Sequence, residues 1–189
     1  MWNGIDMSRR VKRCLTDLVF FAVLTALDRI TKIWAVNNLK DSESIPVIRN
    51  ILELYYLPNG NTGAAFGMLA GHRVLFLLIA IVVVAAIIYL VIFMPDDKKY
   101  KMMEILLVFI AAGGAGNMID RFMQGYVVDF IYIKIINFPI FNVADMYVSI
   151  CTVLLAYIAL FRLKENDYTT LEDALTAPFS KHRKESGGK

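Results

Sequence analysis

Two aspartates stand in parts of the chain that are otherwise apolar. Asp129 lies within the run VVDF, and Asp145 opens an apolar stretch that continues to Phe161. A carboxylate among such side chains loses its hydration, which costs several kcal/mol unless it pairs, takes up a proton or does chemistry. Two carboxylates that share one site do not both ionise, so the pair offers a base and an acid together. Such a pair can take a proton from water and protonate a carbonyl oxygen.

The two aspartates are 16 residues apart in the sequence, which allows them to meet. The β-branched and aromatic run GYVVDFIYIKI predicts a strand, and the turn NFP leads the chain back to a helix that starts at Asp145. A second interpretation involves no chemistry. Asn142 precedes Asp145 by three residues, as in a capping box, where the acid only stabilises the first helical turn. Spacing alone leaves both interpretations open.

Other polar residues accompany this pair. Asn117, Asp120 and Arg121 in GNMIDR share one helix face. One interpretation is an Asp–Arg ion pair with an amide that closes the helix end, which we prefer for Asp120. Asn117 and Arg121 could equally hold a substrate backbone or a lipid ester. Asp28 and Lys32 are one turn apart, a spacing that favours structural support over chemistry. Asn61 in GNTGAAFG is either a turn residue or part of a site.

The composition indicates a membrane protein. Of the 189 residues 58% are hydrophobic, and the mean hydropathy is +0.55. Soluble domains are about 45–50% apolar. We expect four transmembrane helices, at about 14–36, 74–94, 101–119 and 144–161, in an all-α membrane protein with a small β element. The net charge of only +3 argues against a broad nucleic-acid surface. The two histidines cannot make a His-rich metal site, and Cys14 and Cys151 are expected to be reduced packing residues.

The distribution of Lys and Arg predicts the orientation. Thirteen lie in the two terminal segments and the loop after residue 94, against five in segments 37–73 and 119–143. The positive-inside rule therefore puts both termini in the cytoplasm and these two loops outside. The domain is expected to span 1–163, with short strands on the outer face and a polar cytoplasmic tail at 164–189. The two aspartates would then lie at the outer membrane boundary.

Five segments in order carry a family resemblance: DRITK, NTGAAFG, GGAGNMIDR, VVDF and FNVAD. Over residues 14–163 the chain closely resembles lipoprotein signal peptidase (signal peptidase II), the bacterial inner-membrane aspartic peptidase. The resemblance implies that Asp129 and Asp145 are catalytic. It implies substrate-binding roles for four polar residues, Asn61, Asn117, Arg121 and Asn142. It implies structural support from four more, Asp28, Lys32, Asp120 and Gly63.

The resemblance also implies a substrate. This is the prolipoprotein signal peptide, cut just before a cysteine that already carries diacylglycerol. No metal or other cofactor is implied, and sensitivity to the cyclic peptide globomycin is expected. Membrane lipid would be a further partner.

Three other functions remain open on the residues themselves. A proton-coupled transporter predicts acids near mid-membrane and usually a repeated half, and no repeat is visible. A metal-dependent hydrolase would use Asp120, Asp129 and Asp145, and would be sensitive to a chelator. A non-catalytic assembly subunit would tolerate loss of either aspartate of the pair.

Overall fold

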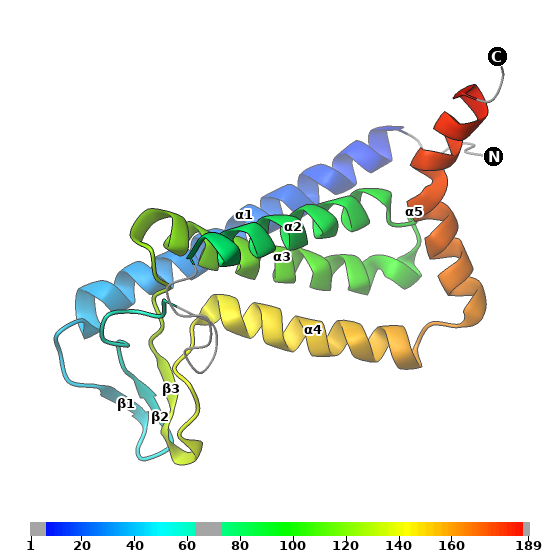
Figure 1. The fold of residues 1–189 in the computed structure, drawn as a ribbon. Helices are drawn as coiled ribbons and strands as arrows, with labels where there is room; N and C mark the ends of the chain where they lie inside the picture. The colour runs from blue at the N-terminus through cyan, green and yellow to red at the C-terminus, as the bar shows by residue number, and fades with distance from the viewer. Residues whose placement is uncertain (1–6, 63–72, 187–189) are drawn as a thin grey trace.

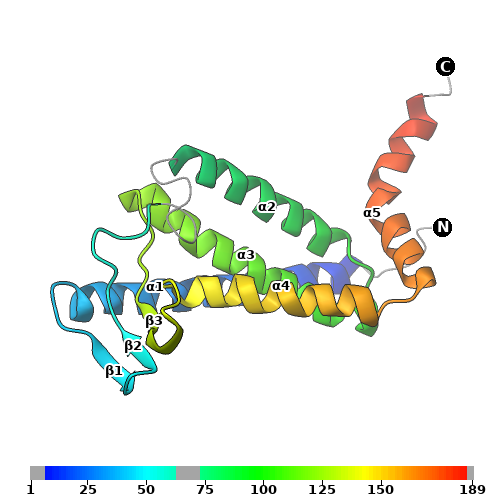
Figure 2. The ribbon, with the colours of Figure 1, turned by 60° about the horizontal axis from the view of Figure 1, so that its bottom comes forward.

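The computed structural model describes residues 7–62 and 73–186 of the chain. Within these ranges four long helices form a bundle, a small sheet lies at one end of it, and a fifth helix lies across the other end (Figures 1 and 2). The helices are α1 (Met7–Leu39), α2 (Arg73–Phe93), α3 (Lys98–Gln124), α4 (Val143–Phe161) and α5 (Glu165–Ser186). The expectation of a mostly helical protein with a small β element is confirmed.

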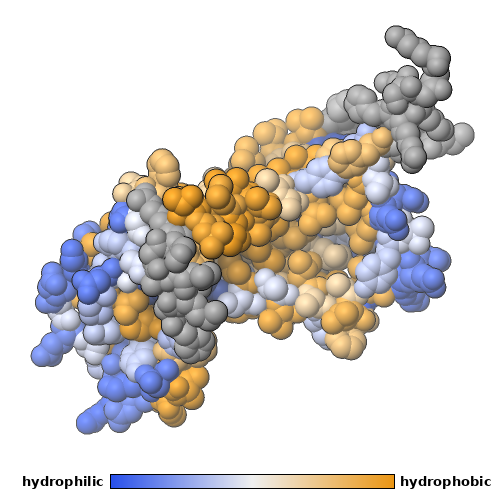
Figure 3. All heavy atoms as spheres, in the orientation of Figure 1, coloured by the Kyte–Doolittle hydropathy of each residue, from blue (hydrophilic) through white to orange (hydrophobic). Residues whose placement is uncertain are grey.

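Three of the described helices, α2, α3 and α4, are long and apolar enough to cross a membrane. Every stretch of 18 residues within α1 contains at least three charged side chains, so α1 does not meet the same standard. Figure 3 shows an apolar surface over the bundle, with hydrophilic residues gathered at the sheet end and near α5. The chain has the features of a membrane protein, while the fourth span and the orientation stay predictions.

Helix α3 is the centre of the bundle, because it packs against α1, α2 and α4. Glycines allow the close approach of α4. A Cβ atom on Gly113 would lie 2.6 Å from the carbonyl oxygen of Ala144, in the first turn of α4. A Cβ atom on Gly116 would lie 2.3 Å from the Asp28 carboxylate of α1. Small residues at such crossings let helix backbones come together.

Charged residues inside α1 and α3 pair with each other near the end of the bundle away from the sheet. Glu104 is buried, and its carboxylate lies 2.9 Å from the Lys101 ammonium and 3.7 Å from the Arg13 guanidinium. Lys101 also lies 3.6 Å from Asp17. Because buried charges need partners, these contacts fix α1 against α3.

The sheet holds the strands β1 (Ile45–Ile48), β2 (Leu52–Leu54) and β3 (Ile131–Ile133), all antiparallel in that order. The strand predicted in GYVVDFIYIKI is confirmed as β3, and β1 and β2 both fall within the run IPVIRNILELYYL. Strand β3 has only three residues, but the chain just before it also pairs with a neighbouring segment. Backbone bonds tie it to residues 55–61: Tyr55 N–H donates to Phe130, Leu57 N–H to Asp129, and Asn61 pairs with Val127. These bonds set the position of Asp129.

Two local signals end α3 and begin α4. Gly125 follows α3 in the left-handed region at φ 88°, and its N–H donates to the carbonyl of Arg121, so the chain turns sharply there. The predicted capping box at Asn142 and Asp145 is present at the start of α4. The segment between these two caps carries the candidate site.

Reporter fusions test the predicted topology. A reporter that is active only outside the cytoplasm is expected to work when fused after Asn61 or Tyr132, and to fail after Asp97 or Ser180. The four-span orientation puts the first pair outside and the second pair inside. Equal expression of all four fusions, checked by immunoblot, is the control. An active fusion at Asp97 would contradict the orientation.

Candidate active site

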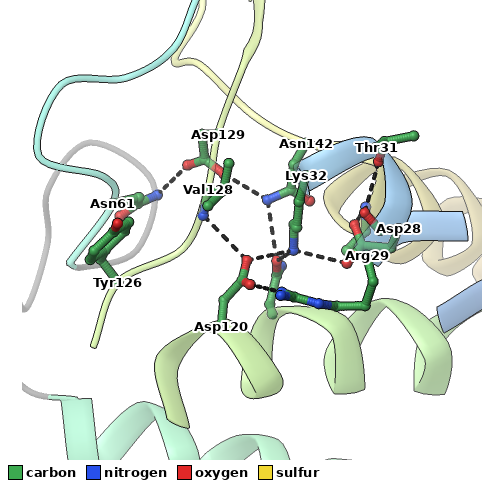
Figure 4. Close-up of polar contacts among 12 residues, drawn as sticks. Asp28, Arg29, Thr31, Lys32, Asn61, Asp120, Tyr126, Val128, Asp129 and Asn142 are labelled. Atoms are coloured by element: carbon green, nitrogen blue, oxygen red, sulfur yellow. Dashed lines mark hydrogen bonds and ion pairs between the residues drawn. The ribbon is translucent and has the colours of Figure 1, made fainter. Parts of the chain in front are cut away.

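Asp129 is held between two asparagine amides. The Asn61 amide donates to Asp129 Oδ2 at 2.8 Å, and the Asn142 amide donates to Oδ1 at 2.6 Å (Figure 4). Asp129 is 1% exposed, and its neighbours Val128 and Phe130 are buried as well. The Asp129 carboxylate has therefore lost its contact with water, as its apolar neighbours in the sequence suggested, and two hydrogen bonds compensate for this loss.

Asp145 lies in the first turn of α4 and shares a partner with Asp129. Its Oδ1 accepts a hydrogen bond from the Asn117 amide at 2.7 Å, and its Oδ2 accepts one from the backbone N–H of Asn142 at 3.2 Å. Asn142 therefore donates to both carboxylates, with its side chain to Asp129 and its backbone to Asp145. The capping interpretation of Asp145 is confirmed, and the cap also brings Asp145 to the same asparagine that holds Asp129.

The environment changes the proton affinity of Asp129. Burial, and after it the negative charge of Asp145, raise the pKa of Asp129 to about 6. The hydrogen bonds from Asn61 and Asn142 act in the opposite direction. A carboxyl group with such a pKa can hold or release a proton close to neutral pH, which a general acid or base requires.

Lys32 lies buried behind the carboxylate pair. Its ammonium group is 2.9 Å from Asp28 and 3.0 Å from Asp120, and it donates to the Asn117 side-chain oxygen at 2.8 Å (Figure 4). That oxygen also accepts a hydrogen bond from the Asn142 amide at 3.2 Å. The support expected from Asp28 and Lys32 is therefore visible as direct contact with residues that hold the pair.

Sequence analysis missed Arg29. It forms an ion pair with Asp120, which lies 91 residues away, and Asp120 also accepts the backbone N–H of Val128 at 3.3 Å. Asp120 does form structural ion pairs, but its partners here, Arg29 and Lys32, lie on α1 and not within GNMIDR, where the sequence suggested an Asp–Arg pair. A signal was available, since Arg29 is one of three charges within five residues of an apolar helix.

A cavity of about 1220 Å³ lies between α4 and the sheet end, and of the two aspartates only Asp145 is among its lining residues. Asp145, Asn61 and Arg121 line it, and the Arg121 guanidinium also lies 4.9 Å from the ring centre of Phe76. Several apolar side chains form the rest of its wall, among them Phe138, Ile140, Phe141, Met146 and Ile150. A polar corner beside an apolar wall suits a ligand with a polar part and an apolar part.

The structure thus brings together most of the residues expected at the site. Asn61 and Arg121 line the cavity, while the amides of Asn117 and Asn142 contact protein partners, so any substrate-binding role for these two stays a prediction. Gly63 lies outside the described residues. Among the residues that are described, no group of three His, Cys, Asp or Glu side chains is placed to hold a metal ion.

Long apolar helices are the features of a membrane protein, and the carboxylates of buried Asp129 and half-buried Asp145 at the end of the bundle form its candidate acid–base site. Comparison with known proteins makes this class more specific. The family model of signal peptidase (SPase) II matches residues 20–161. The lipoprotein signal peptidase of Clostridioides difficile is 35% identical over 144 residues, which cover 76% of this chain and 94% of that protein. That of Streptococcus agalactiae serotype Ia is 43% identical over 144 residues, 76% of this chain and 90% of that protein.

Two solved structures of membrane enzymes have a similar fold. One, described as a bacterial membrane enzyme determined by the in meso method at 2.3 Å resolution, has a TM-score of 0.67 and 33% identity. The alignment covers 80% of this chain and 90% of that chain. The chain therefore belongs to the signal peptidase II family.

Two alanine substitutions on α3 test how closely the helix packs against Asp28, the buried partner of Lys32. Gly116→Ala would press a methyl group against the Asp28 carboxylate, which Lys32 and the Ala144 N–H hold in place. We expect it to lower the free energy of unfolding by about 1–3 kcal/mol, the usual cost of overpacking. Gly114→Ala is the matched control, because its methyl group would meet only Val84, at 3.4 Å.

The measurement is the unfolding midpoint of each purified variant in detergent, with the yield of monodisperse protein as a second reading. Gly114→Ala is expected to behave as wild type or slightly better, since alanine favours a helix. Equal stability of the two variants would contradict the account of the Asp28 contact.

Proposed function

We propose that this chain is an aspartic endopeptidase that removes the signal peptide from prolipoproteins, with Asp129 and Asp145 as its catalytic residues. Membership of the signal peptidase II family supports the reaction, the removal of a signal peptide by a peptidase. The observation that carries the aspartic mechanism is the pair of carboxylates joined by Asn142 beside a large cavity.

The surroundings favour different protonation of the two acids. Asp145 accepts two N–H groups and stands at the N-terminus of α4, where the helix dipole stabilises negative charge. Asp129 also accepts two amide N–H groups, but it is only 1% exposed while Asp145 lines the cavity, and burial with the charge of Asp145 raises the pKa of Asp129 to about 6. Asp145 is therefore the base, and Asp129 holds the shared proton.

The reaction then follows from this assignment. Asp145 takes a proton from water while the water oxygen bonds to the scissile carbonyl carbon, and Asp129 gives its proton to the carbonyl oxygen. The tetrahedral intermediate carries two hydroxyl groups. Asp145 next protonates the leaving amine, the carbon–nitrogen bond breaks, and Asp129 takes back a proton from one hydroxyl. Both acids end in their starting states.

The cavity supports a lipid-bearing substrate. Its polar corner holds Asn61 and Arg121, which can bind peptide or ester carbonyl oxygens. Its apolar wall offers burial to acyl chains, whose transfer from water is favourable by about 25 cal/mol per Å². The bond cut is the one before the diacylglyceryl cysteine, as the family resemblance implies, and globomycin would compete for the same cavity.

The place of the reaction is the outer side of the bacterial cytoplasmic (inner) membrane. The excess of Lys and Arg in the terminal segments and in the loop after residue 94 supports cytoplasmic termini. The sheet and the start of α4 lie at the opposite end of the bundle from α5 (Figures 1 and 2), and Asp145 belongs to the first turn of α4 while Asp129 precedes β3. With that orientation the site meets substrate at the outer membrane boundary.

Removal of one amide is expected to change both rate and pH dependence. Asn61→Ala should lower kcat/KM by an amount that corresponds to a lost buried hydrogen bond, about 1–3 kcal/mol. The Asn61 hydrogen bond lowers the pKa of Asp129, so its loss should raise that pKa and move the alkaline limb of the profile to higher pH. Asn137→Ala is the control, since Asn137 lines the same cavity but bonds to Tyr132. An alkaline limb that stays in place or moves down would contradict the role of Asn61.

Asparagine substitutions test the mechanism itself. Asp129→Asn and Asp145→Asn preserve shape but remove proton exchange, so each should abolish cleavage of a lipidated prolipoprotein peptide by purified enzyme in detergent. The double variant should be no worse than either single one, because residues that act as a unit are not additive. Unfolding midpoints near that of the wild type are the control for folding.

Two arms of the same assay separate the alternatives. Activity that is unchanged by a chelator would exclude a divalent-metal hydrolase. Substantial activity in either single variant would contradict the aspartic mechanism, while the family membership would still stand.

A further inference from the structure

Helix α5 lies outside the part of the chain that the family model matches, which ends at residue 161. It runs crosswise to the bundle, at the end opposite the sheet, in both views (Figures 1 and 2). The sequence from 164 onward is polar and was expected to be a tail, yet the structure forms 22 residues of helix there. Its position therefore needs a physical reason.

Specific contacts hold the first half of α5 on the bundle. Asp167 pairs with Lys99, and its carbonyl accepts the Tyr100 hydroxyl at 3.2 Å. The Lys99 contact, together with the backbone N–H of Lys164, holds the pKa of Asp167 below its usual value, so this carboxylate stays charged. Further along, the Tyr89 hydroxyl of α2 donates to the carbonyl of Leu175. These bonds fix which side of α5 faces the bundle.

That side is apolar. Tyr168, Leu171, Leu175 and Phe179 follow helical spacing along one face, while Asn166, Thr170 and Asp173 lie on the opposite face and are exposed. Leu171 packs against the bundle core. Tyr168 and Phe179, at the two ends of the apolar face, remain 46% and 68% exposed. Tyr168 also contacts the carbonyl of Ala159, and Phe179 the ring of Tyr89, so the described protein covers the middle of this face and only part of its two ends.

We propose that lipid at the cytoplasmic membrane interface covers the rest of the apolar face, so that α5 is an in-plane membrane anchor. Helix α5 lies across the end of a bundle that crosses the membrane. Because its apolar face points toward the bundle, any part of that face that extends beyond the bundle points toward the surrounding acyl chains. Amphipathic helices bind in this way, with aromatic residues at the headgroup level. The basic run KHRK at 181–184 suits anionic headgroups.

Spin labels on the full-length protein test this proposal. Cys14→Ser and Cys151→Ala remove the native thiols, and a nitroxide is attached at Phe179→Cys or, as the matched control on the polar face, at Asp173→Cys. Both proteins are reconstituted in nanodiscs that contain phosphatidylglycerol. Collision rates are measured with oxygen, which concentrates in lipid, and with a water-soluble nickel chelate. Cleavage of a lipidated peptide serves as the check that each labelled protein is folded.

We expect the ratio of oxygen to nickel collisions to be higher at position 179 than at position 173. A label at Tyr168→Cys, at the other end of the apolar face, should behave like the label at 179 and gives a second reading should one variant fold poorly. Equal, water-like ratios at 179 and 173 would overturn the proposal. A label at 179 that neither reagent reaches would also overturn it, since a protein surface and not lipid would then cover the face.

Discussion

One buried positive charge organises the site end of this molecule. Lys32 is 1% exposed, and its ammonium contacts Asp28, Asp120 and Asn117. Each partner holds another part of the chain: Asp28 accepts the N–H of Ala144 at the start of α4, Asp120 accepts that of Val128 next to Asp129, and Asn117 donates to Asp145. An unpaired buried charge is strongly unfavourable, so these contacts have to form together. The ends of three helices and the strand-like segment are thereby fixed around one point.

The same constraint positions the carboxylate pair for the proposed chemistry. Asp129 and Asp145 come from different elements, an extended segment and a helix start, and Asn142 contacts both. The asparagine amides satisfy carboxylate oxygens without neutralising them, since they carry no charge. Burial and mutual repulsion then favour one shared proton on the pair, the state from which an acid and a base can act in one step. Rigid positioning of both groups reduces the reorganisation that the reaction needs.

Local patterns in the sequence predicted the parts of this arrangement that depend on neighbours along the chain. The capping box at Asn142, the one-turn pair of Asp28 and Lys32, and the strand around Ile131 all follow from short spacings. The pairing of Arg29 with Asp120 crosses 91 residues, and no periodicity reports such a contact. The helix α5 was missed for a related reason: polar composition suggested a tail, while its apolar residues are spaced to fit a surface that only the folded bundle provides.

The central claim is that Asp129 and Asp145 share one proton, held by Asp129. Infrared difference spectra of the purified enzyme, recorded across a pH titration, measure protonated carboxyl groups directly. The account predicts a carboxyl band that titrates near the raised pKa of Asp129, about 6. The band should be absent in Asp129→Asn and should titrate at lower pH in Asp145→Asn, where the repelling charge is gone. A band that persists in Asp129→Asn and disappears in Asp145→Asn would contradict the assignment, and a titration that neither substitution changes would contradict the shared proton itself.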